Sequence, residues 1–230
     1  MFSRTGKAVT RLVLASGSPR RRELLQLLGL PFQVVVPQTV ESTVQCSDAA
    51  TQASVLAEMK ALSVATQGPE EIIVAADTLV VLRGRVIGKP TDAASARDTL
   101  IALRTGEHQV VTGLAVVLPG ASTPSLQAVE TRVWMRQYGD EEIASYIDRG
   151  EPLDKAGAYA IQDPEFDPVE RIEGCYANVM GLPLCHLFTT LRDAAFLRSP
   201  PPIAACEGHT GRRCFVAGRI LEAVTHGLCL

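Results

Sequence analysis

An almost unbroken apolar run constrains the fold of this chain more than any other feature. In "IIVAADTLVV" the one charged residue is Asp77, and its neighbours are typical of a buried central strand. A carboxylate inside such a strand is costly unless it is ion-paired, hydrogen-bonded or bound to a metal ion. The run therefore predicts a sheet built around this segment, in which Asp77 either takes part in ligand chemistry or caps a turn.

Strand and helix patterns alternate early in the chain, and strands follow one another later. Strands are expected over Leu12–Ser16, "PFQVVV", the two runs beside "RGR", "EHQVVTGLAVVLPG" and "SLQAVETRVWMRQY". Helices are expected over Arg20–Leu28, "SDAATQASVLAEMKALSVAT", "TDAASARDTLIALR", "GDEEIASYIDRG", and from Pro183 to about Arg198. Beyond this point, "SPPPIAACEGHTGRR" breaks regular structure and leaves either one short helix or a loosely attached end. This order favours a mixed α/β sheet over a purely parallel one.

The composition fits one globular domain without a nucleic-acid or membrane partner. The 230 residues are 47% hydrophobic, and a net charge of −3 gives no basic footprint for nucleic acid. No apolar stretch is long enough for a membrane span. The six cysteines form no CxxC pair and no Cys/His ligand set; they are Cys46, Cys175, Cys185, Cys206, Cys214 and Cys229. We therefore expect free thiols in a reducing compartment, the cytoplasm.

The turn "SGSPRRR" places three arginines where the first strand feeds a helix. Such a junction gathers free backbone N–H groups and the positive end of a helix dipole, which together suit an anion. Arg20 and Arg21 at that end repel each other unless something negative is bound, and a polyphosphate would relieve the repulsion. The alternative is that these arginines are solvated or pair with Glu23 and other surface acids. Physical reasoning on the residues leaves both open.

Other polar residues have an ordinary interpretation when each is taken alone. Lys60 lies on a predicted helix, where a lysine usually extends to the surface. Lys89 in "VIGKP" and Glu41 in "PQTVEST" are typical loop residues, and Thr78 fits a strand. Gln162 follows "DKAGAYA", a small-residue stretch that lets backbone approach a ligand but also occurs in turns. No GxSxG, GxGxxG or Walker loop is present, and the histidines share no ligand spacing.

Taken together, these segments resemble the Maf family of nucleoside triphosphate pyrophosphatases. The matching segments are "LASGSPRRRELL", "FQVVVPQTVES", "LAEMKA", "VAADTLVVLRGRVIGKP", "EHQVVTG", "EEIASYI", "EPLDKAGAYAIQ" and "IEGCYANVMGLPL". They occur in the family's order and cover roughly Arg11 to Leu191. The resemblance implies a domain over residues 11–198, preceded by an extension of residues 1–10 and followed by a tail, residues 199–230, without a functional interpretation.

The resemblance also implies a fold and an activity. Members of this family are two-lobed α/β proteins with a mixed sheet flanked by helices and a central nucleotide-binding cleft, similar to inosine triphosphatases, and they often form homodimers. They cleave a nucleoside triphosphate between the α and β phosphates and need a divalent cation, Mg²⁺ or Mn²⁺. The expected partner is therefore a nucleoside triphosphate substrate.

Site residues follow from the same resemblance. The family's active-site positions correspond to Ser16, Arg20, Glu41, Lys60, Asp77 and Lys89. Asp77 corresponds to the proton acceptor, and Glu41 with Asp77 would hold the cation; whether Asp77 is base, metal ligand or both stays open. The cationic residues would neutralise the triphosphate, and arginine adds bidentate geometry.

Base preference is implied by three positions. The dTTP/UTP pyrophosphatase subgroup carries Arg, Thr and Gln where this chain has Arg20, Thr78 and Gln162, whereas relatives acting on 7-methyl-GTP carry Gln directly after the catalytic Asp. The chain differs from the usual family pattern at Val40, before Glu41, and in the bulky acidic loop after Gln162. The alternatives are a non-catalytic nucleotide-binding regulator of cell division and a 7-methyl-GTP pyrophosphatase.

Overall fold

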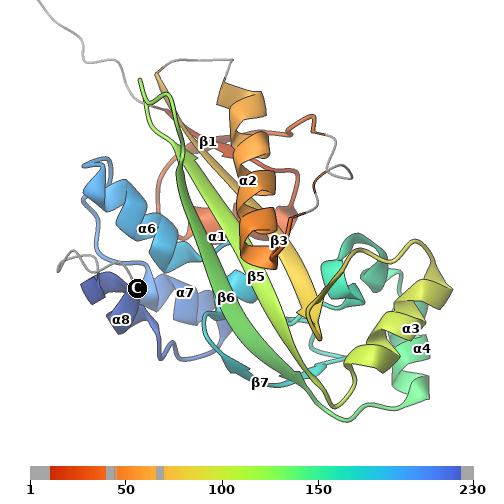
Figure 1. Cartoon of the computed structure of the whole chain (residues 1–230). Helices are drawn as coiled ribbons and strands as arrows, with labels where there is room; N and C mark the ends of the chain where they lie inside the picture. Colours follow the sequence, from red (N-terminus) through yellow and green to blue (C-terminus); the bar gives the residue numbers. More distant parts are fainter. Residues whose placement is uncertain (1–10, 40–43, 45, 66–69, 224–230) are drawn as a thin grey trace, which may run out of the picture.

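A computed structural model of the chain describes residues 11–39, 44, 46–65 and 70–223. A mixed sheet of seven strands runs through it in the order β2-β1-β3-β5-β6-β7, with β4 beside β3 (Figure 1). The strands are β1 (Arg11–Ala15), β2 (Phe32–Val35), β3 (Glu71–Leu82), β4 (Arg85–Ile87), β5 (Glu107–Val117), β6 (Ser125–Met135) and β7 (Val169–Glu173). β1 pairs in parallel with β2 and β3, and the other pairs are antiparallel. The predicted mixed sheet is confirmed.

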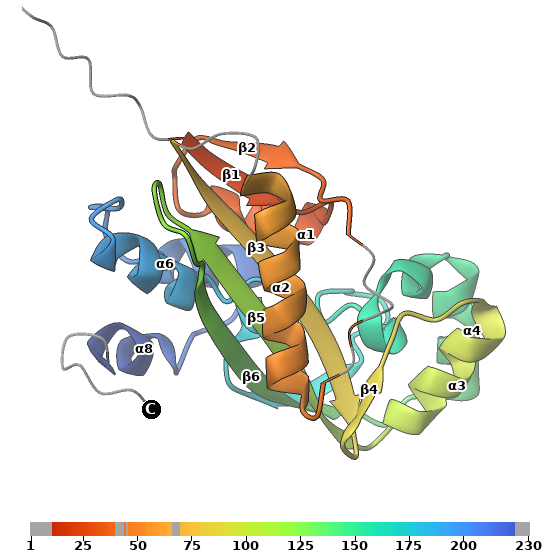
Figure 2. The same ribbon diagram turned by 45° about the horizontal axis from the view of Figure 1, so that its top comes forward.

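Helices cover both faces of this sheet. Helix α2 (Ala49–Ala65) lies across one face, as Figures 1 and 2 show. Its alanines Ala57 and Ala61 pack on Ala75 and Ala115 of the sheet, because their spacing of four residues puts them on one side of the helix. The opposite face carries α1 (Pro19–Gln26) and α6 (Leu184–Asp193), whose leucines and Phe188 join the largest core cluster.

A second lobe lies at the far end of the long strands. It contains α3 (Ala93–Leu103), α4 (Asp140–Asp148) and the 3₁₀ turns η2 (Glu151–Asp154) and η3 (Ala156–Ala158) (Figure 1). Asp92 caps α3, since its carboxylate accepts a hydrogen bond from the backbone N–H of Ser95 at 2.7 Å. The expected two-lobed architecture is therefore present, with β3, β5 and β6 running between the lobes.

The C-terminal part differs from the sequence-based expectation. α6 ends at Asp193 rather than near Arg198, and Ala195 just beyond it has a left-handed backbone with φ of 56°. The tail was expected to hold one short helix or to be loosely attached, but it forms α7 (Ile203–Thr210) and α8 (Ala217–Ala223). Both pack on the main core through side chains such as Cys206 and Leu221. β7 and α5 (Tyr176–Val179) were not predicted either.

One edge of β3 is open for part of its length. β1 pairs with β3 as far as Val74, and β4 begins to pair at Val80 on the same edge. Among the described residues, no strand pairs with that edge between these points. The break gives side chains on both faces of β3 access to the space between the two lobes.

Among the helices that the structure describes, none is long and apolar enough to cross a membrane.

Candidate active site

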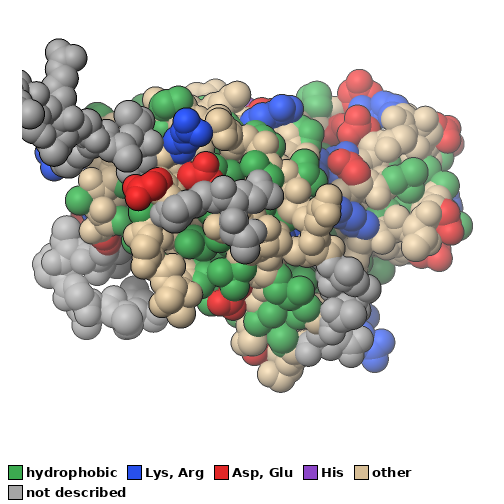
Figure 3. All heavy atoms as spheres, turned by 90° about the horizontal axis from the view of Figure 1, so that it is seen from above, with side chains coloured by type: hydrophobic (Ala, Val, Ile, Leu, Met, Phe, Trp, Pro, Cys, Tyr) green, Lys and Arg blue, Asp and Glu red, His purple; other side chains and the backbone are tan. Residues whose placement is uncertain are grey.

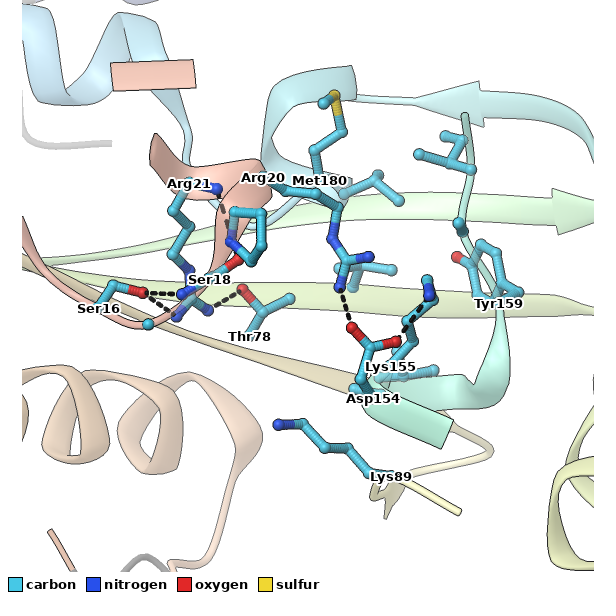
Figure 4. A pocket seen from close by; sticks show the side chains of 18 of the residues that line it. Ser16, Ser18, Arg20, Arg21, Thr78, Lys89, Asp154, Lys155, Tyr159 and Met180 are labelled. Atoms are coloured by element: carbon cyan, nitrogen blue, oxygen red, sulfur yellow. Dashed lines mark hydrogen bonds and ion pairs between the residues drawn. The ribbon is translucent and has the colours of Figure 1, made fainter. Parts of the chain in front are cut away.

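A cavity of about 390 Å³ lies at this break in the sheet edge. Its walls come from the turn after β1, the segments after β2 and β4, helix α2, and the region from η2 to Gln162. The predicted site residues Ser16, Arg20, Lys60, Thr78, Lys89 and Gln162 all line it. Figure 4 shows four of them, Ser16, Arg20, Thr78 and Lys89. A volume in this range suits a small-molecule ligand.

The turn between β1 and α1 is held by hydroxyl groups. Ser18 caps α1, and its side chain accepts a hydrogen bond from the backbone N–H of Arg21. Pro19 occupies the first helical position, where its missing N–H is not needed. The buried Ser16 accepts a hydrogen bond from the backbone N–H of Ser18 at 3.1 Å. The turn thus presents the N-terminus of α1 to the cavity, where its positive dipole end favours an anion.

Arg21 joins three separate segments around this turn. Its Nε donates to the carbonyl of Gly181 at 2.8 Å, and its Nη2 donates to Thr78 Oγ1 at 3.1 Å. Its Nη1 also lies within 3.5 Å of Ser16 Oγ (Figure 4). The Thr78 hydroxyl is 2.9 Å from that of Thr112 on the neighbouring strand. The guanidinium therefore fixes the orientation of two predicted substrate-binding hydroxyls.

Lys60 and Asp77 form a buried ion pair. Lys60 Nζ lies 2.5 Å from Asp77 Oδ1, and the two residues are only 7% and 6% exposed. The expectation that an isolated helical lysine extends to the surface was wrong here, because α2 turns Lys60 toward the sheet together with Ala57 and Ala61. Asp77 Oδ2 makes no hydrogen bond to a described residue. Lys60 lines the cavity, and Asp77 sits directly behind it.

Charges from the two lobes meet across the cavity. Arg20 Nη2 of α1 lies 3.9 Å from Asp154 Oδ2 of η2, and Lys155 Nζ donates to Asp154 Oδ1 at 2.6 Å (Figure 4). Burial opposes ionisation of Asp154, but the hydrogen bond and charge of Lys155 outweigh it, so the pKa of Asp154 lies below its usual value. Lys155 is buried and also donates to the Glu151 backbone carbonyl.

The cavity is strongly cationic. Its lining includes Arg20, Arg21, Lys60, Lys89 and Lys155, and Asp154 is the one carboxylate among the described lining residues. Lys89 reaches toward the same space from the segment after β4 (Figure 4). Such an excess of cations in a concave site concentrates field lines and attracts a polyanion. Arg20 and Arg21 are half-buried and line the cavity, whereas Arg22 is exposed and does not line it. Arg20 also pairs with the exposed Asp154, so the predicted role of these arginines in anion binding stays a prediction.

The predicted metal site lies partly outside the described residues. Glu41 lies outside the described residues, so its predicted roles in catalysis and metal binding stay predictions. Within the described residues, no three His, Cys, Asp or Glu side chains gather closely enough to hold a metal ion.

Two residues of the cavity, Asp154 and Lys155, are not singled out by the sequence pattern, and the contacts of a third, Arg21, are not predicted by it. Lys155 and Asp154 stand in the segment "EPLDKAGAYAIQ", whose small residues are its distinctive feature, while two adjacent opposite charges are ordinary in a turn. Arg21 was noted for its charge and not for its contacts with Thr78 and Gly181, which are 57 and 160 residues away. Distances of this kind in the sequence leave no local pattern from which to predict a contact.

The chain is similar in sequence to one protein family and to several named proteins. The family model described as "Maf-like protein" matches residues 11–194. The dTTP/UTP pyrophosphatase of Thermomicrobium roseum is 47% identical over 83% of this chain and 87% of its own length. Those of Caldanaerobacter subterraneus subsp. tengcongensis and Carboxydothermus hydrogenoformans are 46% and 44% identical, over 79% and 80% of this chain and 88% and 98% of theirs. A solved HAM1 protein structure from Coxiella burnetii has a TM-score of 0.39 and 17% identity over 56% of this chain and 75% of that one.

Proposed function

The chain belongs to the family of Maf-like proteins, and from that membership we propose that it is a nucleoside triphosphate pyrophosphatase that hydrolyses dTTP and UTP to the monophosphate and pyrophosphate. The observation that carries this proposal is the cationic cavity at the N-terminus of α1, with the buried carboxylate of Asp77 behind it. A triphosphate carries about four negative charges at neutral pH, and the cations from both lobes match it. The relatives named dTTP/UTP pyrophosphatase support the same reaction.

The residues suggest how the bond is broken. Water attacks the α phosphorus, the bond from that phosphorus to the bridging oxygen breaks, and pyrophosphate leaves with the bond electrons. Where Asp77 acts as the base, the water proton goes to Oδ2, because Lys60 already donates to Oδ1. Arg20, Lys60 and Lys89 stabilise the charge that develops on the phosphate oxygens.

A divalent cation, Mg²⁺ or Mn²⁺, is part of the proposal. Such hard cations bind one or two carboxylates together with phosphate oxygens, and Asp77 offers a carboxylate oxygen that Lys60 does not engage. Glu41 is the expected second carboxylate ligand. When bound, the cation would neutralise charge on the phosphates. Asp77 would then contribute as a ligand, as a base, or in both ways.

The proposed preference for thymine and uracil as the nucleobase depends on Thr78 and Gln162. Both line the same cavity as Arg20, from different walls, so one nucleotide can contact all three. Thr78 is held by Arg21 and Thr112, and its hydroxyl has a fixed direction. A fixed hydroxyl discriminates between nucleobases better than a freely rotating one, because it cannot turn to suit a mismatched nucleobase.

Location and assembly complete the proposal. We expect the protein to be located in the cytoplasm, since the described cysteines are all free thiols. We also expect a homodimer. The exposed side chains of Val34 and Val36, at 42% and 66%, lie on and just after the edge strand β2 and offer apolar surface for it. Light scattering after size exclusion tests this assembly.

The activity is tested by incubating the protein with dTTP, UTP, CTP, GTP or 7-methyl-GTP, each with Mg²⁺ and with a chelator. Release of pyrophosphate and of the monophosphate is followed by chromatography. We expect hydrolysis led by dTTP and UTP and abolished by the chelator. A preference for 7-methyl-GTP would refute the base assignment, and release of inorganic phosphate would refute the cleavage position. Tight nucleotide binding without turnover would identify a binding protein instead of an enzyme.

A further inference from the structure

A second, larger cavity of about 850 Å³ lies between the family domain and the C-terminal tail. β7, α5 and the start of α6 form one wall, and α7, α8 and the segment between them form the other. The family model ends at residue 194, so one wall of this cavity consists of residues beyond the matched region. None of its lining residues belongs to the substrate cavity described above.

The rim of this second cavity is positively charged in a protein of net charge −3. Its lining includes Arg132, Arg171, Arg212, Arg213 and Arg219, and its carboxylates are Glu170 and Glu173. Glu173 pairs with both Arg132 and Arg171. Arg213 and Arg219 are exposed and make no ion pair within the described part of the chain. The lining therefore includes two exposed guanidinium groups that no described carboxylate neutralises.

The interior of the second cavity is apolar. Cys175, Cys185, Cys206 and Cys214 line it together with aliphatic side chains such as Leu184. Burial raises the pKa of the Cys175 and Cys185 thiols to about 12 and that of Cys206 to about 11. At neutral pH these groups are uncharged thiols, which behave as small hydrophobic side chains. Phe215 also lines this cavity and is 81% exposed, and the central guanidinium carbon of Arg213 lies 5.7 Å from the centroid of its ring.

We propose that this second cavity binds a small organic anion with an apolar body. The apolar body lies against the thiol and aliphatic interior, and its carboxylate or phosphate group is held by Arg213 and Arg219. An apolar pocket with few, well-placed polar groups at its mouth is the usual form of a small-molecule site. The charge excess at the rim selects anions, and the uncharged interior disfavours compact inorganic ions.

The protein contains its own reporter for this binding. Trp134 is the one tryptophan of the chain, and the guanidinium of Arg171 lies 3.6 Å from its ring centroid, with that of Arg132 at 5.3 Å. Both arginines also line the second cavity. An anion that enters the cavity changes the field on the indole ring, and the tryptophan emission changes with it.

The test titrates the full-length protein with decanoate while the Trp134 emission is recorded. Decyltrimethylammonium, with the same alkyl chain and the opposite charge, is the matched probe. We expect a saturable change with decanoate and none with the cation. Decyl phosphate gives the same change if the site accepts both head groups, and its failure restricts the site to carboxylates. No saturable response to either anion refutes the proposal.

Two double variants locate the site. R213A/R219A removes the unpaired charges from exposed positions and should weaken decanoate binding by about tenfold or more, because the head group loses its charged hydrogen-bond donors. R213K/R219K keeps the charge and should retain most of the affinity. The control R85A/R198A removes two exposed arginines that line neither cavity and should bind as the unchanged protein does.

The outcome is independent of the proposed enzymatic activity. All variants should retain nucleotide hydrolysis, and an excess of dTTP should leave decanoate binding unchanged. Displacement of decanoate by dTTP, or equal affinity in R213A/R219A and the control, would place the probe elsewhere and overturn the proposal.

Discussion

Asp77 and Thr78 are adjacent in the chain and yet serve opposite faces of the sheet. Successive side chains of a strand alternate in direction, so Asp77 meets Lys60 of α2 while Thr78 meets Arg21 of α1. The two side chains can act on one substrate because the edge of β3 is open there. A proton acceptor and a base-reading hydroxyl are thereby placed with a fixed mutual geometry.

Replacing Asp77 by Asn should lower kcat by about two to four orders of magnitude, the usual contribution of a general base. The amide keeps the size of the side chain but neither takes a proton nor neutralises Lys60. Steady-state turnover of dTTP measures the effect, and circular dichroism checks the fold. Asp98→Asn, an exposed change on α3, is the control and should be unaffected. Turnover within a few-fold of normal in a folded Asp77→Asn protein would rule out the role.

Replacing Arg21 by Lys should loosen the Thr78 hydroxyl without removing positive charge. A lysine cannot reproduce the fork that reaches Gly181 and Thr78 together. We expect a loss of stability of about 1–3 kcal/mol and a smaller ratio of kcat/KM between dTTP and GTP. Urea unfolding and the two kcat/KM values measure these effects.

Arg22→Lys is the matched control for this change, because the neighbouring side chain is exposed and does not line the cavity. If Arg21→Lys lowered stability and left the nucleotide preference unchanged, Arg21 would be structural only.

Individual site residues were predictable to different degrees. Arg20 and Arg21 could be interpreted locally, since a strand–turn–helix junction already implies an anion site. Lys60 could not, because its burial depends on how α2 rests on a sheet formed by distant segments. Its role was accessible only through family resemblance. Lys155 was missed because its partners, Asp154 and Glu151, are ordinary neighbours in a loop.

At the scale of elements, Gly113 determines how closely α2 approaches the sheet. It lies opposite Asp77 on β5, and a Cβ atom there would come within 2.1 Å of the Ala53 carbonyl oxygen of α2. This contact would be with backbone, which cannot rotate away as a side chain can. Because glycine has no side chain, α2 can pack close enough to the sheet for Lys60 to reach Asp77.

Gly113→Ala should therefore push α2 outward, with a cost of about 1–3 kcal/mol or more in unfolding free energy. Activity should fall as well, because Lys60 moves away from Asp77 with the helix. Urea unfolding and dTTP turnover measure the two effects. Gly208→Ala in α7, where a Cβ meets nothing within 4 Å, should leave both unchanged or raise stability slightly. Equal behaviour of the two variants would contradict this account.

The elements that were predicted are those with long apolar runs or a clear alternation. β3 and β5 are nearly continuous apolar runs and β6 alternates, while α2 and α3 are long segments rich in alanine and leucine. β7 was missed because Val169 alone among its five residues is buried, which leaves no alternation to detect. The tail helices were underestimated because "SPPP" suggests an irregular end. Prolines disfavour a helix where they stand but allow one to begin at Ile203, directly after them.

At the scale of the whole molecule, the charge distribution is uneven. Acidic side chains gather at the end formed by α3 and α4, where the first turn of α4 holds Asp140, Glu141 and Glu142 (Figure 3). Each of the two cavities is lined by five Lys or Arg side chains and has fewer carboxylates than cations. A net charge of −3 therefore conceals two local sites that attract anions.

Global stability should depend on pH through one buried histidine. Burial lowers the pKa of His108 from 6.5 to about 4, while its Nε2 lies 2.8 Å from the hydroxyl of Tyr159. The unfolded chain binds the proton more tightly, so stability is complete above pH 6.5 and falls as the pH drops toward 4. The loss approaches about 3 kcal/mol at the acid end of this window.

Urea unfolding of the intact protein at several pH values measures this slope. His108→Phe removes one titrating group and fills a similar volume, so its stability should lose the His108 share of the pH dependence between 4 and 6.5, while the share of His186, whose pKa burial also lowers, remains. An unchanged slope in the variant would assign the acid sensitivity to other groups.

The open edge of β3 sits in the middle of a strand that is otherwise continuous from Glu71 to Leu82. The lobes are thus joined by a hydrogen-bonded ribbon, with no flexible linker between them in the described sheet. Such a ribbon bends less easily than it twists, and the hydrogen bonds between β3, β5 and β6 share the load. We therefore expect the two lobes to move relative to each other by a small twist of the whole sheet. No single loop should act as a hinge.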